Sequence, residues 1–203
     1  LHKEFTPAIE KDKSLRKDLG IPSDATVIGQ IGALTRNKRS DFLIKCMAPL
    51  LRKEDDLYLV IIGRGELKDE LEKLIQAEKL TGKVLLTGFV EKTDIYLKYV
   101  LDIHILASLE EGLGISVIEA AGGGIPSIVS DSTGLREVVE HLKTGLRFKP
   151  DDEGQLKAQV EQLYSNTNLR TQLGEQARIE AVKKFSLDQY KKDIVDTIQK
   201  ISS

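Results

Sequence analysis

Two carboxylates and two glycines lie close together in the segment from position 110 to position 131. Glu111 and Glu119 have seven residues between them, and these include Gly112 and Gly114. The segment follows an apolar run, 102–108, that is typical of a buried strand, and it continues as an apolar helix. A glycine turn at the start of a helix leaves backbone N–H groups free to bind phosphate, and carboxylates accept hydrogen bonds from hydroxyl groups. The segment therefore predicts a site for a nucleotide sugar.

Glu119 has the strongest case for a binding role. Its neighbours at 117, 118, 120 and 121 are all apolar, which predicts a helix that is buried on nearly every side. A buried carboxylate needs partners, because an unpaired buried charge is costly. The hydroxyl groups of a ribose would be suitable partners. The alternative is a Glu119 that faces solvent or pairs with a lysine.

The loop after the first strand-like run carries three cations. Gly32 ends the run, and Arg36, Lys38 and Arg39 follow it. Arginine offers a fork of donors and lysine a point charge, so the loop suits a diphosphate. A solvated basic turn is an equally weighted alternative. Ser40 is expected to cap the helix that begins after this loop.

Two further loops follow the second and third runs. Gly63 and Gly65 flank an arginine, and we interpret both glycines as turn residues. Phe89 and Val90 follow the third run and could form the apolar wall of a base site, although a core position for Phe89 is as well supported. The three glycines at 122–124 are typical of a close-packed helix end.

Composition excludes several classes of protein. With 203 residues and a net charge of −2, the chain has no field that would attract nucleic acid or an anionic membrane. One cysteine, Cys46, excludes an internal disulfide framework and favours a reducing compartment, so we expect a cytoplasmic protein. No apolar run approaches a membrane span. The three histidines, of which His104 is expected in the core, lack metal-ligand spacing, and no metal site is predicted.

Apolar strand-like runs alternate with helical patterns along most of the chain, which predicts a doubly wound α/β domain with a parallel sheet of about six strands. The expected strands are 26–32, 57–63, 83–88, 103–108, 127–130 and a weaker 145–149. The expected helices are 41–52, 67–79, 94–100, 115–122, 135–141, 155–165 and 169–184. Ligands of such sheets bind beyond the carboxyl ends of the strands, where the residues named above gather.

Three regions are expected along the chain. Residues 1–22 form a connector and a first helix that ends at Gly20, and residues 23–185 form the ligand-binding domain. A closing helix, 186–203, is predicted to begin at Ser186 as its N-cap. The first residue is Leu1 rather than Met, so we expect the chain to be part of a longer protein.

Five motifs follow these strands in order, and together they resemble a known family. They are Gly-x-Leu with a later Lys, Gly-x-Gly, Gly-Phe-Val, Ser-Leu-Glu-Glu-Gly-Leu-Gly with a later Glu-Ala, and Gly-x-Pro. This order resembles the retaining GT-B glycosyltransferases with the paired-glutamate signature. The resemblance extends from Phe5-Thr-Pro7 to the closing helix, and it implies a Rossmann-like fold that is the C-terminal, donor-binding half of a two-domain enzyme.

The resemblance also implies roles for the residues of the glutamate segment. Glu119 would bind the ribose hydroxyls, and Glu111 would position the donor sugar near its anomeric carbon. The backbone from Gly112 through Leu113 and Gly114 to Ile115 would hold the sugar and the phosphates.

Other implied roles fall on the first and third loops. Lys38 would neutralise the leaving diphosphate, which is the electrostatic part of catalysis. The loop that contains Phe89 and Val90 would contact the base. The implied reaction is transfer with retention, without a metal or another cofactor. The family usually has Arg at the position of Ala33, so Arg36 would have to reach the phosphates in its place.

The leading hypothesis is the donor domain of a glycosyltransferase that adds a hexose to a glycan or glycolipid. The acceptor, and any peripheral contact with the inner face of the membrane, would belong to an N-terminal domain outside this chain. Alone, the chain should bind a nucleotide without catalysing transfer. The alternatives are a non-catalytic nucleotide-sugar-binding subunit, which Ala33 favours, and a sugar-nucleotide epimerase of the same fold. A nicotinamide-binding domain is disfavoured, because the first loop lacks Gly-x-Gly-x-x-Gly.

Overall fold

The computed structural model describes residues 13–187, 189, 191, 194–195 and 198–199. The first twelve residues of the expected connector lie outside the described residues, as do 188, 190, 192–193, 196–197 and 200–203 of the expected closing helix. Within the described part, Ser186 accepts a hydrogen bond at its Oγ from the backbone N–H of Gln189 (3.2 Å), as expected of an N-cap.

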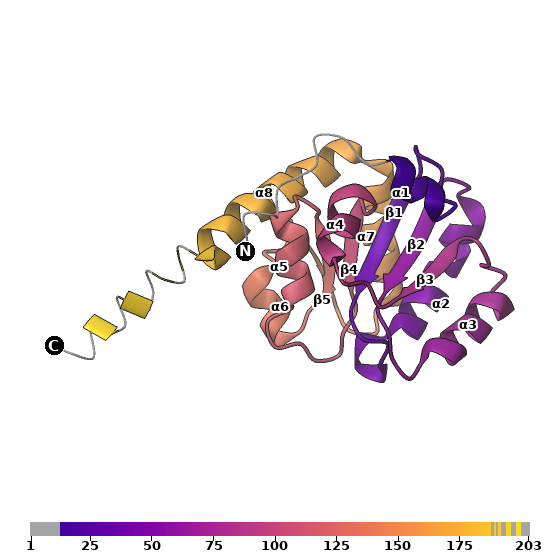
Figure 1. Cartoon of the computed structure of the whole chain (residues 1–203), viewed down its shortest axis with the longest axis horizontal. Helices are drawn as coiled ribbons and strands as arrows, with labels where there is room; N and C mark the ends of the chain where they lie inside the picture. Colours follow the sequence, from indigo (N-terminus) through magenta and orange to yellow (C-terminus); the bar gives the residue numbers. More distant parts are fainter. Residues whose placement is uncertain (1–12, 188, 190, 192–193, 196–197, 200–203) are drawn as a thin grey trace.

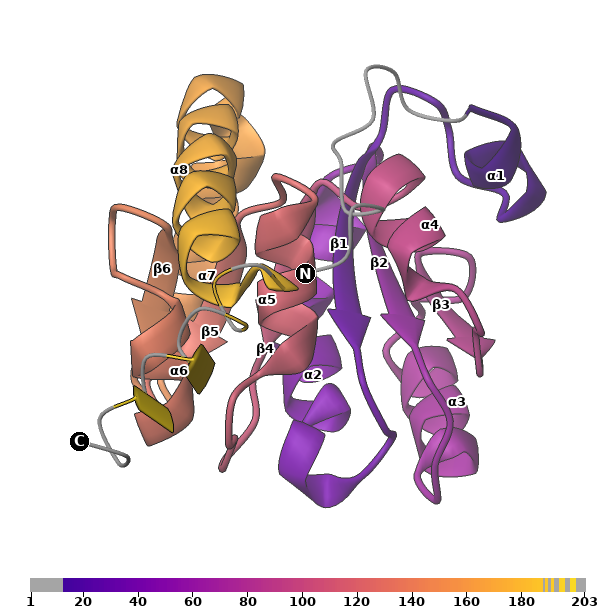
Figure 2. The same ribbon diagram turned by 60° about the vertical axis from the view of Figure 1, so that its left-hand side comes forward.

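Six parallel strands form one sheet in the order β3-β2-β1-β4-β5-β6 (Figures 1 and 2). The central strand β1 is buried at all six positions, because both of its faces are covered and both of its edges are paired. The strands are β1 (Thr26–Ile31), β2 (Leu57–Ile62), β3 (Val84–Gly88), β4 (Ile103–Leu106), β5 (Ser127–Ser130) and β6 (Gly145–Phe148). Each expected strand is present, and most end one or two residues earlier than predicted.

Helices cover both faces of this sheet, which confirms the predicted doubly wound α/β fold (Figure 2). One core cluster joins α2, α3 and α7 to one face, and a second joins α1 and α4 to the other, where α5 also packs. The helices are α1 (Lys13–Asp18), α2 (Ser40–Lys53), α3 (Lys68–Ala77), α4 (Thr93–Tyr99), α5 (Ile115–Gly122), α6 (Thr133–Val138), α7 (Glu153–Ser165) and α8 (Thr167–Phe185), with a 3-10 turn η1 (Arg36–Lys38).

Helix α8 lies along α5. Ala177 and Ala181 of α8 pack against Ala121, and Arg178 donates a hydrogen bond to the carbonyl of Gly122. A Cβ atom at Gly174 would lie 2.1 Å from the carbonyl oxygen of Gly124. The glycines at 122–124 are therefore a close-packed helix end, as predicted.

Two local predictions are wrong. Ser40 does not cap α2: the N-cap is Arg39, in a left-handed conformation, and the buried Ser40 Oγ has no hydrogen-bond partner. The sixth helix ends at Val138 rather than 141, because the chain turns there. Glu140 donates its backbone N–H to Thr144 Oγ1 (2.8 Å), and this bond closes the turn before β6.

Candidate functional site

The loops after β1 and β4 are fastened together at the carboxyl end of the sheet. Asn37 donates from Nδ2 to the carbonyl of Glu110 (2.9 Å) and accepts at Oδ1 from the N–H of the same residue (3.0 Å). Its own carbonyl accepts from the N–H of Leu109 (3.0 Å). Strands β1 and β4 are neighbours where the strand order reverses, which is where ligands of such sheets bind. Asn37 was not predicted as a site residue, although it lies between two residues that were.

This junction brings the two predicted catalytic side chains into contact. Lys38 and Glu111 form an ion pair, and their side chains are 21% and 16% exposed. Ser108 Oγ donates to the same Glu111 oxygen (3.2 Å), and Gln30 Nε2 donates to the carbonyl of Lys38 (2.7 Å). Both side chains are thus held at the end of the sheet, with a positive and a negative group side by side. Ser108 begins the Ser-Leu-Glu-Glu-Gly-Leu-Gly motif but was given no role, and Gln30 lies outside the motifs.

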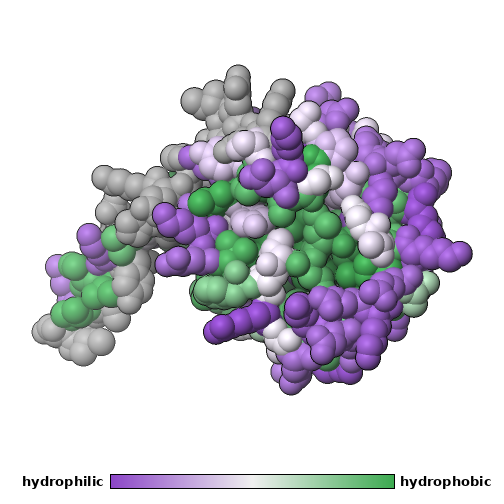
Figure 3. Space-filling view, turned by 45° about the vertical axis from the view of Figure 1, so that its right-hand side comes forward, coloured by the Kyte–Doolittle hydropathy of each residue, from purple (hydrophilic) through white to green (hydrophobic). Residues whose placement is uncertain are grey.

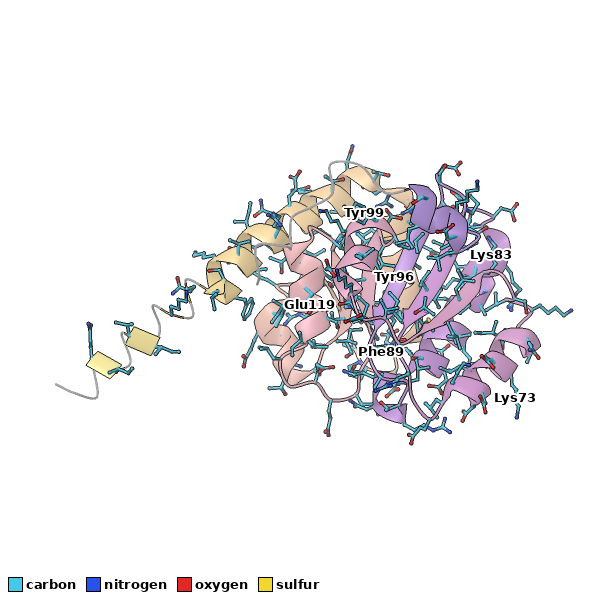
Figure 4. The ribbon with its side chains drawn as sticks, in the orientation of Figure 1. Lys73, Lys83, Phe89, Tyr96, Tyr99 and Glu119 are labelled. Carbon is cyan, nitrogen blue, oxygen red and sulfur yellow. The ribbon has the colours of Figure 1, made fainter. Side chains whose placement is uncertain are left out.

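Glu119 lies on α5, half-buried, while the residues on both sides of it are buried. Burial raises the pKa of its carboxyl group, and the negative charge of Asp94 at the start of α4 raises it further. Within the described part of the chain, no hydrogen bond or ion pair involves this carboxylate. Figure 4 shows Glu119 and Phe89 on the same face of the molecule. The predicted lysine-paired alternative is therefore absent among the described residues.

The start of α5 has the geometry expected of an anion-binding turn. Gly114 is its N-cap, with φ of 65°, and no side chain caps the helix. The side chains of Leu113 and Ile115, on either side of Gly114, are 46% and 67% exposed. A Cβ atom at Gly134 would lie 1.8 Å from the carbonyl oxygen of Gly112, so α6 packs directly on the glycine turn.

A pocket of about 320 Å³ opens beside these loops. The residues that line it are mostly apolar or glycine: Ile31, Gly32, Ala33, Ile62, Gly63, Arg64, Phe89, Val90 and Thr93. Phe89 is 66% exposed, so the alternative of a core position is wrong for it. The guanidinium of Arg64 lies 4.9 Å from the centre of the Phe89 ring. Figure 3 shows one face of the molecule on which apolar residues gather in the middle and hydrophilic residues surround them.

Glycines hold the first two loops against each other. A Cβ atom at Gly63 would lie 1.8 Å from the carbonyl oxygen of Gly32, and one at Gly65 would lie 2.4 Å from that of Leu34. Leu34 donates its N–H to the carbonyl of Arg64 (3.0 Å). These glycines are therefore points of close contact between two backbone segments as well as turn residues.

The other cations of the first loop have carboxylate partners elsewhere. Arg36 binds Glu70 of α3 through two hydrogen bonds of 2.7 and 2.6 Å, and Arg39 pairs with Asp151 before α7. A phosphate at Arg36 would have to compete with Glu70. Of the three cations predicted for a diphosphate clamp, Lys38 alone pairs with a predicted site residue.

His104 is a buried neutral residue of β4, as expected, but not a fully satisfied one, because its buried Nε2 has no hydrogen-bond partner among the described residues. Its Nδ1 lies 3.1 Å from Ser127 Oγ. Burial, together with the charge of Lys38, lowers the pKa of His104 to about 3. Its ordinary pKa is about 6.5, so an unfolded chain takes up a proton below that pH and the folded chain does not. The stability that His104 contributes is therefore present above about pH 6.5 and is lost as the pH falls toward 3.

This titration predicts how the protein responds to acid. The unfolding free energy of the unchanged chain should fall when the pH is lowered from 7 to 5. In His104→Asn we expect this fall to be smaller by about 2 kcal/mol, because the variant has no histidine to protonate at this position. Urea denaturation of both proteins at both pH values measures the difference. Equal losses in the two proteins would show that His104 does not remain neutral in the folded state.

Two further findings concern the described residues only. No three or more of their His, Cys, Asp and Glu side chains are grouped so that they could hold a metal ion. None of their helices is both long enough and apolar enough to cross a membrane.

The fold is that of a Rossmann-like domain, with the candidate ligand site at the carboxyl ends of its strands. A sequence profile of the glycosyl transferases group 1 matches residues 11–180. The chain belongs to this family.

Its relatives are about twice as long. An uncharacterized glycosyltransferase of Methanocaldococcus jannaschii is 29% identical over 188 residues, which are 92% of this chain and 48% of the relative. The alpha-D-kanosaminyltransferase of Streptomyces kanamyceticus is 30% identical over 174 residues, which are 85% of this chain and 45% of the relative. The chain therefore spans about half the length of these proteins.

Solved structures confirm the fold. HepE of Anabaena, in complex with UDP, matches with a TM-score of 0.88 at 21% identity, over 97% of this chain and 54% of HepE. It has also been solved with UDP-glucose. The C-terminal domain of the glycosyl transferase LpcC from Francisella tularensis matches with a TM-score of 0.79 at 23% identity, over 90% of this chain and 96% of that domain. The chain thus has the fold of the C-terminal half of a GT-B protein.

Proposed function

We propose that this chain is the donor-binding domain of a retaining glycosyltransferase, which transfers a hexose from a nucleotide-diphosphate sugar to a glycan or glycolipid. The observation that carries the proposal is the half-buried carboxylate of Glu119, which no described residue pairs. Glu119 lies on the same face of the molecule as Phe89, which lines the pocket (Figure 4). A ribose would supply the hydroxyl donors that the carboxylate lacks.

The neighbouring groups suit the rest of a donor. Phe89 and Val90 offer an apolar wall for the base, and the uncapped start of α5 offers N–H groups for the phosphates. Lys38 would stabilise the charge that develops on the leaving diphosphate. Glu111 beside it would position the sugar near its anomeric carbon. The HepE complexes with UDP and UDP-glucose support a donor of this class, with uracil as one candidate base.

The acceptor and the location of the whole protein are part of the same proposal. We expect the acceptor to bind the half of the protein that this chain does not span, as is usual when two domains share one cleft. No cofactor and no metal would be required, because Lys38 and the helix start supply the positive charge. We place the protein in the cytoplasm, with any contact with the membrane made by the other half.

One observation favours a second candidate, a nucleotide-sugar-binding protein without transferase activity. Ala33 lines the pocket at a position where the family usually has an arginine. Arg36, which would have to replace that arginine, is bound to Glu70. Weak stabilisation of a leaving diphosphate would leave binding intact and slow the transfer.

The proposal is tested by titrating the 203-residue chain with UDP, GDP and ADP in a calorimeter. We expect one of the three to bind with a dissociation constant between about 1 μM and 1 mM, the usual range for enzyme substrates. If the folded chain bound none of the three nucleotides at concentrations several times the upper end of this range, the donor-site proposal would be contradicted.

A further inference from the structure

Arg64 differs from the other cations around the pocket because no described carboxylate pairs with it. Arg36, Lys38 and Arg39 bind Glu70, Glu111 and Asp151, respectively. The exposed Arg64 side chain lies over the Phe89 ring, with its guanidinium 4.9 Å from the ring centre. Among the described residues that line the pocket, Arg64 is the one that carries a positive charge.

The backbone of Arg64 is held close to the first loop. Gly63 precedes it and lies against the carbonyl of Gly32, and the carbonyl of Arg64 accepts from the N–H of Leu34 (3.0 Å). Ala33 lies between these two contacts and brings no charge. The first two loops therefore place an exposed guanidinium beside an uncharged turn that lines the pocket.

The face of Phe89 can serve one partner at a time. A nucleotide base stacks on an aromatic ring more strongly than an exposed arginine does, so a base on the face that Arg64 covers would displace the guanidinium. The displaced Arg64 is anchored next to the Gly32–Ala33 turn, and the nearest new negative charge there is the nucleotide's diphosphate. Its fork of donors matches phosphate oxygens.

We propose that Arg64 rests on Phe89 in the free chain and moves to the terminal phosphate of the nucleotide when the base occupies the ring. This inference rests on the proposed function, and it assigns to Arg64 the phosphate contact that was predicted for Arg36. Base binding and phosphate binding are then coupled through a single contact, because the base releases the cation.

The test compares three ligands with one base: the tightest-binding of UDP, GDP and ADP, its monophosphate and its nucleoside. They are titrated calorimetrically into the unchanged chain, Arg64→Ala, Arg64→Lys and the control Arg52→Ala. Arg52 pairs with Glu78, and its loss changes net charge equally without touching the pocket. Thermal melting of each variant checks that it is folded.

We expect Arg64→Ala to weaken diphosphate binding by about 10-fold or more, the loss of one hydrogen bond to a charged group. Nucleoside binding should be unchanged or tighter, because Phe89 is then free. Arg64→Lys should restore part of the loss, and Arg52→Ala should resemble the unchanged chain. Equal losses for all three ligands would show that Arg64 holds the base instead, and no loss for the diphosphate would show that it binds no phosphate; either result overturns the inference. If the unchanged chain binds no diphosphate, the proposed function itself fails and the inference with it.

Discussion

Glu119→Gln is expected to weaken nucleotide binding by about 10- to 100-fold, the loss of hydrogen bonds to a charged acceptor. The same change should make the free chain more stable at neutral pH. Burial and Asp94 raise the pKa of the Glu119 carboxyl in the folded chain, so its ionised form opposes folding at neutral pH. The stability this group contributes is present at low pH and is lost as the pH rises through its folded pKa. Glutamine keeps the shape and removes the charge.

Calorimetry with the bound diphosphate and urea denaturation at pH 7 measure the two effects. Glu161→Gln, at an exposed position of α7, is the matched control and should change neither quantity. Opposite signs for stability and binding are the signature of a residue kept for its ligand, since a structural residue would lose both. A Glu119→Gln chain that binds as tightly as the unchanged chain would remove this carboxylate from the donor site.

Gly63→Ala is expected to cost about 2–4 kcal/mol of unfolding free energy and to weaken nucleotide binding by at least about 10-fold. The residue has φ of 148°, and an added Cβ would lie 1.8 Å from the carbonyl oxygen of Gly32. Two backbones meet there, so neither can yield without separating the first two loops. That separation would move the loop that carries Lys38.

Gly82→Ala is the control for this substitution. Gly82 also has a positive φ, 83°, but a Cβ atom there would meet nothing within 4 Å. It should therefore show the conformational cost alone, about 1 kcal/mol, and leave nucleotide binding unchanged. Urea denaturation and calorimetry compare the two variants. If Gly63→Ala were no less stable than Gly82→Ala, the close contact between the loops would not be a constraint.

The regular elements could be predicted because each is specified by its own residues. The strand β2 is a continuous apolar run, and its burial on both faces follows from that run alone. The helix α5 was predicted from its first residue to its last, because glycines bound an apolar segment. The C-terminal end of α6 was missed because the Thr144 hydroxyl, several residues away, accepts a hydrogen bond from the Glu140 N–H and closes the turn that follows the helix.

The site could be predicted where its residues directly follow strands, because the carboxyl ends of parallel strands meet at one edge of the sheet. Glu111 and Lys38 were both expected at the carboxyl end of the sheet, and they do meet there. The sequence did not predict which charged side chains form ion pairs with each other. The pairing of Arg36 with Glu70 depends on how α3 packs beside the first loop, and nothing in the spacing of the two residues indicates it. The same holds for Asn37 and Glu110, which join strands that are neighbours in the sheet but distant in sequence.

The donor-site proposal would be tested most directly by a crystal structure of this chain with the nucleoside diphosphate that it binds. We predict that the base lies against Phe89 and Val90, that the ribose hydroxyls donate to the Glu119 carboxylate, and that the phosphates lie at the start of α5. A nucleotide bound elsewhere, or one whose ribose does not contact Glu119, would contradict it.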